Sequence, residues 1–463
     1  MLRLTFLLVW LLTFFYSTAQ GLTVRLQEAV RKMEADPQFK HALLGFCMLD
    51  SKTGKVLFER NSQIGLAPAS CQKVITSVAA FELLGKDYRY KTVLGYSGQI
   101  VNGTLEGNLL VKGTGDPTLG SWRWPSTREN VLLQKWTSEL KQAGIKNMKG
   151  VVSADIAHWS SATIPNGWIW QDIGNYYGAG ASVLNWRENQ FDVVLRSGNT
   201  PGDQCSIVSI SPKLSQPSFT CEVKAGAKGS GDNAYIYLPA DSPAFIRGTI
   251  PPGETAFTIS GSFTNSARQL TATLTSTMQA AGIQSAQRAY SQQDGVNKTF
   301  VPVFTHLSPT LDSINHWFLK KSINLYGEAL IKTIAFEKDG FGDMDKGLEM
   351  VKLFWSQRGI EKSAINIYDG SGLSPQNRVT TDALAKVMLY ARSKPWFQVF
   401  SNSLPVINGV AMKSGSIGGA RSYTGYLNNK DGNGYTFAII VNNYDGNSNE
   451  VVRKIWALLD ILK

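Results

Sequence analysis

The segment GLAPASCQKVITSVAAFELLG, residues 65–85, places a serine and a lysine three positions apart at the start of an apolar run. An apolar run of this length predicts a helix, with Gly85 as its C-cap. Residues three apart share a helical face, so we expect Ser70 and Lys73 side by side. Apolar surroundings disfavour the ammonium form of Lys73 and lower the pKa of the amine. Such a lysine can take the proton of a neighbouring hydroxyl.

The pattern Ser-x-Asn, which can supply a proton-relaying hydroxyl and a substrate-holding amide, occurs three times. Residues 197–199 have the composition of a turn, which needs only a structural explanation. Residues 313–315 fall inside an expected helix, and their polar groups are predicted to face solvent. Residues 322–324 lie at an expected junction between two helices, where both side chains can face a cleft. Ser322 and Asn324 are therefore the candidate pair.

The pattern Lys-Ser/Thr-Gly occurs twice, and only the later copy suits a binding site. Residues 52–54 lie at the tip of a β-hairpin expected over residues 41–60, where a turn explains them. Lys413 and Ser414 come just before an expected pair of strands near the C-terminus. An edge strand there would offer an ammonium, a hydroxyl and backbone N–H groups to an extended peptide that ends in a carboxylate.

In chain order, SCQK at residues 70–73, SIN at 322–324 and KSG at 413–415 form a specific signature. The ordered triple resembles that of penicillin-binding proteins and serine β-lactamases. Three longer segments narrow the resemblance to DacB-type D-alanyl-D-alanine carboxypeptidases/endopeptidases, the class C low-molecular-mass penicillin-binding proteins. They are GTGDPTLG, SINLYGEAL and YDGSGLSPQNRV. Ile323, where a polar residue is common, and Ser414, where threonine is common, are mild departures.

This resemblance implies a serine-type D-Ala-D-Ala carboxypeptidase that acts on peptidoglycan stem peptides through an acyl-enzyme. It leaves open whether the enzyme is also a DD-endopeptidase. β-Lactams would be covalent inhibitors, and no metal or other cofactor is expected. The implied site residues are the nucleophile Ser70, the base Lys73 and the proton relay Ser322, the substrate-binding Asn324, Lys413 and Ser414, and an oxyanion hole made by the backbone N–H groups of Ser70 and Ser416.

Two alternatives remain open at this point. The first is a β-lactamase-like hydrolase, which the large spacing between motifs and the lack of a recognisable deacylating carboxylate disfavour. The second is a non-catalytic wall-binding or assembly protein, which the intact motifs disfavour. Ser-x-x-Lys alone is weak evidence, because Ser138 and Lys141 repeat its spacing on an expected solvated helix face.

The pattern of elements predicts an α+β fold, a penicillin-binding-protein/β-lactamase-like transpeptidase domain split by a large insertion. Residues 20–85 and 291–463 would form the catalytic domain, with helices and a late strand pair. Residues 86–290 would form an inserted, mainly β module of one or two lobes, because short strand-like pieces alternate with Gly, Pro and Asn.

Two segments carry weaker hypotheses. Asp369 and Ser371 can line the cleft, but a tight structural turn is the preferred interpretation. The tryptophans of IPNGWIWQDIGNYY, residues 164–177, are expected to pack in the core of the insertion rather than to hold substrate.

The N-terminus predicts export. Residues 1–19 combine Arg3, an apolar stretch too short to cross a bilayer, and small residues before a cleavage point after Ala19, which is typical of a secretory signal peptide. We expect no membrane span after cleavage, and a location in the periplasm or at the extracellular face of the cell wall. The 46 Lys+Arg against 35 Asp+Glu suit an anionic wall polymer, whereas the absence of a long basic run argues against nucleic acid. Whether Cys205 and Cys221 form a disulfide stays open.

Overall fold

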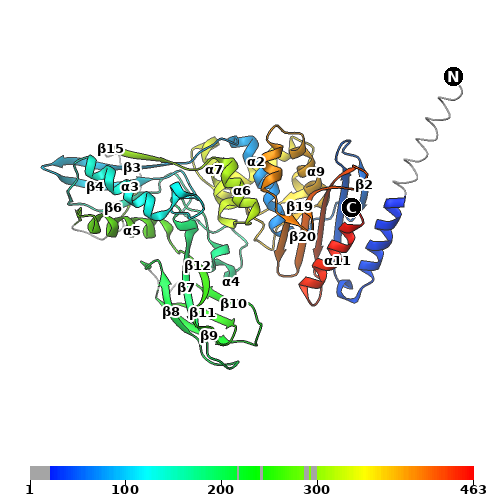
Figure 1. The fold of residues 1–463 in the computed structure, drawn as a ribbon. Coiled ribbons are helices and arrows are strands. Elements are labelled where there is room, and N and C mark those ends of the chain that lie inside the picture. Colours follow the sequence, from blue (N-terminus) through cyan, green and yellow to red (C-terminus); the bar gives the residue numbers. More distant parts are fainter. Residues whose placement is uncertain (1–20, 216–217, 240–242, 286–290, 294–299) are drawn as a thin grey trace, which may run out of the picture.

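The computed structural model describes residues 21–215, 218–239, 243–285, 291–293 and 300–463 (Figure 1). The expected signal peptide and the expected end of the insertion at residue 290 lie outside this part of the chain. The described chain is α+β, with one helix-and-sheet unit and two further lobes (Figure 1). No helix among the described residues is long and apolar enough to cross a membrane.

The helix-and-sheet unit is built on a six-stranded antiparallel sheet in the order β18-β19-β20-β21-β1-β2. The first long strand pairs with the last, Leu43 opposite Asn442. Because β21 is buried along almost its whole length, both faces of the sheet must be covered. The strands are β1 (Leu43–Asp50), β2 (Val56–Arg60), β18 (Val406–Ile407), β19 (Val410–Ile417), β20 (Ala420–Asn428) and β21 (Gly434–Asn442).

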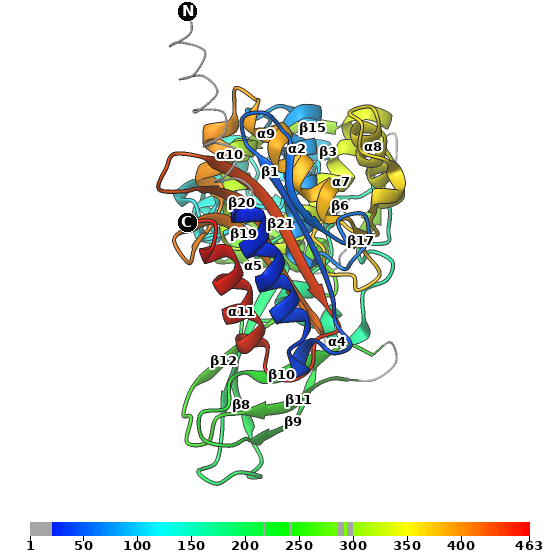
Figure 2. The ribbon, with the colours of Figure 1, turned by 90° about the vertical axis from the view of Figure 1, so that its right-hand side faces the viewer.

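One face of this sheet is covered by the helix of residues 21–34 and by α11 (Ser448–Asp460), which lie side by side in Figure 2. The other face packs on a helical cluster whose central member is α2. The helix ends at Gly85, at φ 87°, as its sequence predicts. The cluster comprises α2 (Lys73–Leu84), α6 (Leu311–Lys320), α7 (Asn324–Asp339), α8 (Met344–Ser356), α9 (Thr381–Arg392) and α10 (Phe397–Ser403).

The chain between α2 and α6 forms the two other lobes, each with its own hydrophobic cluster. The first lobe has a sheet covered by two helices, α3 (Glu129–Gln142) and α5 (Ser266–Ala280). Its strands are β3 (Lys91–Val101), β4 (Thr104–Lys112), β5 (Asn147–Met148), β6 (Val152–Asp155), β13 (Gln284–Ser285), β14 (Ser291–Gln293) and β15 (Phe300–Leu307). The second lobe holds β7 (Gln190–Arg196), β8 (Ser206–Ser211), β9 (Phe219–Ala225), β10 (Asn233–Tyr237), β11 (Ala244–Ile250) and β12 (Phe257–Ser262).

The inserted chain leaves and rejoins the catalytic unit at one place. Strand β15 pairs with β3, and Tyr90 and Ser308 exchange hydrogen bonds beside them. We infer that the insertion extends to about Leu307, because β15 belongs to the sheet of the first lobe. The short elements are α4 (Trp170–Ile173), η1 (Pro37–Phe39), η2 (Ala69–Gln72), η3 (Pro125–Thr127), η4 (Tyr176–Gly178), η5 (Arg187–Asn189), η6 (Lys362–Ala364), β16 (Ile365–Asn366) and β17 (Arg378–Val379).

Candidate active site

Ser70 and Lys73 meet at the start of α2, as the helical spacing predicts. Ser70 lies in η2, which runs directly into α2. The Nζ of Lys73 donates to the Oγ of Ser70 over 2.9 Å. Ala69, just before the serine, has φ 45°, a left-handed conformation that L-residues rarely adopt. A residue held in this backbone region beside a candidate nucleophile is typical of a functional turn.

Lys73 is fully buried and has three hydrogen-bond acceptors. Besides Ser70 these are the Oδ1 of Asn324 at 2.7 Å and the carbonyl of Ser371 at 2.8 Å. Burial, reinforced by the nearby charge of Lys413, lowers the pKa of Lys73 well below its usual value of 10.5. The amine is thereby biased towards its neutral form while it is held against the serine hydroxyl.

Ser322 and Asn324 lie between two helices, as expected. Helix α6 ends at Lys320 and α7 begins at Asn324. Ser322 has φ 58°, so the chain turns sharply between the helices and both side chains reach the cavity. The other Ser-Ile-Asn copy departs from its prediction. Asn315 is buried rather than solvated, because α2 packs on that face of α6 and Ser77 donates to its Oδ1 over 2.6 Å.

Strand β19 brings the third motif to η2. Lys413 is almost fully buried, its Nζ donates to the carbonyl of Ser414 over 2.7 Å, and burial lowers its pKa to about 8. The thiol of Cys71 donates to the carbonyl of Lys413 over 3.2 Å, which ties strand and helix together. Gly415 makes this approach possible, since a Cβ there would lie 2.6 Å from the carbonyl oxygen of Pro68.

A cavity of about 910 Å³ opens over these residues. Ser70, Ser322, Asn324 and Ser416 line it together with residues of the insertion. Lys413 and Ser414 are not among the described residues that line it. Arg421 lines the cavity instead, on β20 directly opposite Ser416. Sequence reasoning missed this arginine, because no motif marks it.

The loop after β16 holds Lys73 from the side opposite Ser70. It is a tight turn, as preferred from the sequence, with Gly372 at φ 85°. The carboxylate of Asp369 is fully buried and accepts hydrogen bonds from Gln72, Trp168 and Asn377, each over 2.9 Å. This network places the carbonyl of Ser371 on Lys73. The turn therefore has a part in the site that its composition alone did not predict.

Glu328, one turn along α7 from Asn324, is a second buried carboxyl group that the motifs did not mark. Its Oε2 accepts from the backbone N–H of Gly370 over 2.8 Å. Burial and then the proximity of Asp369 raise the pKa of Glu328 to about 8. Both carboxyl groups act on Lys73 against the effect of burial, because a negative charge nearby favours the ammonium.

Several other predicted positions can now be placed. Ser138 and Lys141 are exposed on α3, as predicted for an incidental repeat of the spacing. The expectation that the tryptophans of residues 164–177 fill the core of the insertion is wrong. Trp168 bonds to Asp369 of the catalytic unit, and the side chain of Trp170 is 53% exposed. None of the four cysteines forms a disulfide, so Cys205 and Cys221 are both free thiols.

The sequence profile of the D-Ala-D-Ala carboxypeptidase 3 (S13) family matches residues 26–409. A D-alanyl-D-alanine carboxypeptidase from an Actinomadura species is 28% identical over 461 residues, which cover 91% of this chain and 81% of that protein. The D-alanyl-D-alanine carboxypeptidase DacB of Haemophilus influenzae is 26% identical over 427 residues, with coverage of 87% and 85%.

Penicillin-binding protein 4 (dacB) from Haemophilus influenzae has a similar crystal structure. It aligns with a TM-score of 0.79 at 22% identity and covers 94% of this chain and 98% of that one. A second crystal structure of the same protein, in complex with a β-lactam, aligns with a TM-score of 0.74 at 21% identity. These likenesses show that the fold is that of the Haemophilus protein.

Proposed function

The chain belongs to the D-Ala-D-Ala carboxypeptidase 3 family of serine peptidases, and from this premise we propose that it cleaves the terminal D-alanine of peptidoglycan stem peptides through an ester on Ser70. The observation that carries the proposal is the buried amine of Lys73, held 2.9 Å from the Oγ of Ser70. A neutral amine in this position is a general base beside a nucleophile.

Acylation starts when Lys73 takes the proton of Ser70. The Oγ attacks the carbonyl carbon of the penultimate D-alanine, and a tetrahedral intermediate forms with its negative charge on the carbonyl oxygen. The backbone N–H groups of Ser70 and Ser416 stabilise this oxyanion. Removing one donor of such a site typically costs about 2.7–4 kcal/mol of transition-state stabilisation.

The intermediate collapses when the peptide nitrogen receives a proton and leaves as D-alanine. Ser322 passes this proton from Lys73 to the nitrogen, because its side chain shares the cavity with Ser70. Water then attacks the ester, the proton returns to Ser70, and the shortened stem peptide leaves. The overall reaction is a hydrolysis that consumes one water molecule and needs neither an oxidant nor a reductant.

Four side chains bind or attract the substrate. Asn324 binds the peptide amide, and Lys413 with Ser414 attracts the terminal carboxylate. Lys413 is almost fully buried and does not line the cavity. Arg421 does line it and is the cation that the carboxylate can contact.

A β-lactam would acylate Ser70 in the same way, since it presents a strained amide beside a carboxylate. The Haemophilus protein that shares this fold has been crystallised with a β-lactam. The polymer substrate lies outside the cytoplasm, so the proposal includes export through the N-terminal segment and action at the cell wall. Cleavage of cross-linked stem peptides, as in a DD-endopeptidase, is part of the same proposal.

The test is labelling by a fluorescent penicillin together with the release of D-alanine from a D-Ala-D-Ala peptide. We expect Ser70→Ala to abolish both while the melting temperature stays within a few degrees of wild type. Ser138→Ala, the matched control, should retain both activities. A labelled Ser70→Ala protein would overturn the proposal. Rapid hydrolysis of the penicillin without D-alanine release would identify a β-lactamase, and binding without acylation would identify a non-catalytic wall protein.

A further inference from the structure

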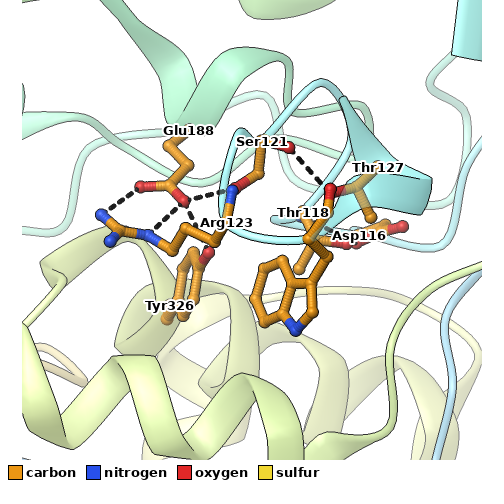
Figure 3. Close-up of polar contacts among 8 residues, drawn as sticks. Asp116, Thr118, Ser121, Arg123, Thr127, Glu188 and Tyr326 are labelled. Carbon is orange, nitrogen blue, oxygen red and sulfur yellow. Dashed lines mark hydrogen bonds and ion pairs between the residues drawn. The ribbon is translucent and has the colours of Figure 1, made fainter. Parts of the chain in front are cut away.

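Four side chains form a polar cluster where the insertion meets α7 (Figure 3). At its centre the Oε1 of Glu188 accepts from the Oγ of Ser121 at 2.7 Å, the Nε of Arg123 at 2.7 Å and the hydroxyl of Tyr326 at 2.8 Å. The Oε2 accepts from the Nη2 of Arg123 at 3.0 Å. Arginine and carboxylate thus form a two-point ion pair, a geometry that fixes the direction of both groups.

The backbone around Glu188 is in an unfavourable conformation. Arg187, Glu188 and Asn189 all have positive φ, 53°, 53° and 56°. Three successive residues other than glycine are rarely left-handed, and such segments persist only where their surroundings hold them. In this conformation the side chain of Glu188 points from the insertion towards Tyr326 of the catalytic unit (Figure 3). The Glu188 side chain is fully buried there.

The cluster joins two parts of the chain that are distant in sequence. Ser121, Arg123 and Glu188 belong to the insertion, whereas Tyr326 lies on α7, two residues after Asn324. Helix α7 makes several further hydrogen bonds to the insertion, two of which lie near the site. The Nδ2 of Asn324 donates to the carbonyl of Tyr177 over 2.8 Å, and the Nζ of Lys332 donates to the carbonyl of Ala181 over 3.1 Å.

One of these contacts decides how the Asn324 amide is oriented. The Lys73 amine lies 2.7 Å from one end of the amide and donates its hydrogens, so that end must be the oxygen. The carbonyl of Tyr177 can only accept, so the end that it faces must be the NH₂ group. The insertion and the catalytic lysine therefore hold the same amide from opposite sides.

The turn that carries Glu188 is tied to the segment that carries Tyr177. The side-chain NH₂ of Asn189 donates to the carbonyl of Gly180 over 2.8 Å. A displacement of the Glu188 turn would accordingly displace the Tyr177 carbonyl as well.

We propose that Glu188 and Tyr326 are positioning residues, which lock α7 to the insertion and so keep the Asn324 amide between the Tyr177 carbonyl and the Lys73 amine. The inserted module is then a structural part of the active site. This inference rests on the proposed function, because the consequence that it predicts is measured on the acylation of Ser70.

The test is a double-mutant cycle on the acylation rate constant at saturating fluorescent penicillin. Tyr326→Phe removes the hydroxyl that crosses the interface and leaves the ion pair of Glu188 with Arg123 intact. We expect acylation to slow by about 10-fold or more, because a hydrogen bond to a charged group corresponds to a factor of roughly 10 to 150 in a rate. In an Asn324→Ala protein the same change should alter the rate by less than about 2-fold, because the residue through which it acts is gone.

Tyr390→Phe is the matched control. The Tyr390 hydroxyl also donates to a carboxylate, Glu82 at 2.5 Å, which is paired with Lys394, but this cluster lies wholly within the catalytic unit. We expect Tyr390→Phe to lower the melting temperature about as much as Tyr326→Phe does, and to leave the acylation rate constant unchanged. Glu188→Gln should slow acylation as Tyr326→Phe does, because an amide presents N–H groups to a site that already holds three donors.

The outcomes separate this inference from the proposed function. Suppose that Ser70→Ala is not acylated and that Asn324→Ala is acylated slowly, as the proposed function requires. If Tyr326→Phe then slows acylation equally in the wild-type and the Asn324→Ala proteins, the cluster is merely structural and the inference is wrong. Unchanged acylation in Tyr326→Phe would also refute it. If Asn324→Ala acylates at the wild-type rate, the assignment of Asn324 in the proposed function fails instead.

Discussion

Gly415→Ala offers a direct test of the claim that β19 must lie close to Ser70. The glycine of the third motif faces η2, and a Cβ added there would lie 2.3 Å from the Oγ of Ser422, 2.6 Å from the carbonyl oxygen of Pro68 and 2.9 Å from the backbone nitrogen of Cys71. Two of these atoms are backbone, so no side-chain rotation can relieve those contacts.

The size of the effect follows from these distances. Ordinary contact begins at 3.4 Å, so the contact with Pro68 is about 0.8 Å too short. Strand and helix must separate by about that distance, and the N–H of Ser416 moves away from Ser70 with the strand. A misplacement of about 1 Å can cost about 100-fold in rate, and losing one oxyanion donor costs a similar factor. We therefore expect acylation about 100-fold slower, with about 1–3 kcal/mol less stability from overpacking.

The assay is acylation by a fluorescent penicillin, followed in protein shown by its unfolding curve to be folded. Gly231→Ala is the control, since a Cβ at that position meets nothing within 4 Å and Gly231 has no positive φ. A folded Gly415→Ala protein that acylates at the wild-type rate would refute the assignment of β19 to the oxyanion hole.

Three further predictions follow from the geometry. Ser322→Ala should slow acylation about 100- to 10,000-fold, because it removes the proposed proton relay. Ser313→Ala should leave the acylation rate unchanged, because the Ser313 hydroxyl accepts a hydrogen bond from the indole N–H of Trp124. Equal acylation rates in the two variants would place the relay elsewhere. Lys413→Met removes a charge that lowers the pKa of Lys73, so the rising limb of the pH–rate profile at saturating substrate should move to higher pH; an unmoved limb would mean that burial alone sets this pKa. Burial lowers the pKa of His306 from 6.5 to about 4, so the unfolded chain binds this proton more readily than the folded chain as pH falls. In urea titrations, the stability lost between pH 6.5 and 4 should be about 3 kcal/mol smaller in His306→Leu than in the wild type, and an equal loss would contradict this role of His306.

The parts of the site that could be predicted are those that lie within one segment or one motif. Ser70 and Lys73 meet because three residues make nearly one helical turn, a relation that depends on local geometry alone. The junction at Ser322 was recognisable because a polar break separates two apolar periodic stretches. The order of the motifs identified Lys413, but a sequence pattern could not show that its side chain is almost fully buried.

The residues whose roles were missed or misjudged depend on contacts between distant segments. Asp369 collects donors from η2, from the insertion and from its own loop, and no spacing announces such a convergence. Asn315 was predicted to face solvent because its helix has a polar stripe, but α2 covers that stripe and supplies a partner for the amide. No motif marks Glu188, and its left-handed backbone is visible only in three dimensions.

The pairing of β1 with β21 has a consequence for biosynthesis. A ribosome makes β1 among the first elements and β21 nearly last, so β1 waits for its neighbour on that side until almost the whole chain has emerged. Lys413 and the strand that carries it arrive equally late. Burial and the charge of Lys413 lower the pKa of Lys73 in the folded chain, so we expect this pKa to stay near its ordinary value until these segments have packed around the amine. We therefore expect a nascent or truncated chain that lacks β21 not to be acylated by a fluorescent penicillin, and the complete chain to be acylated.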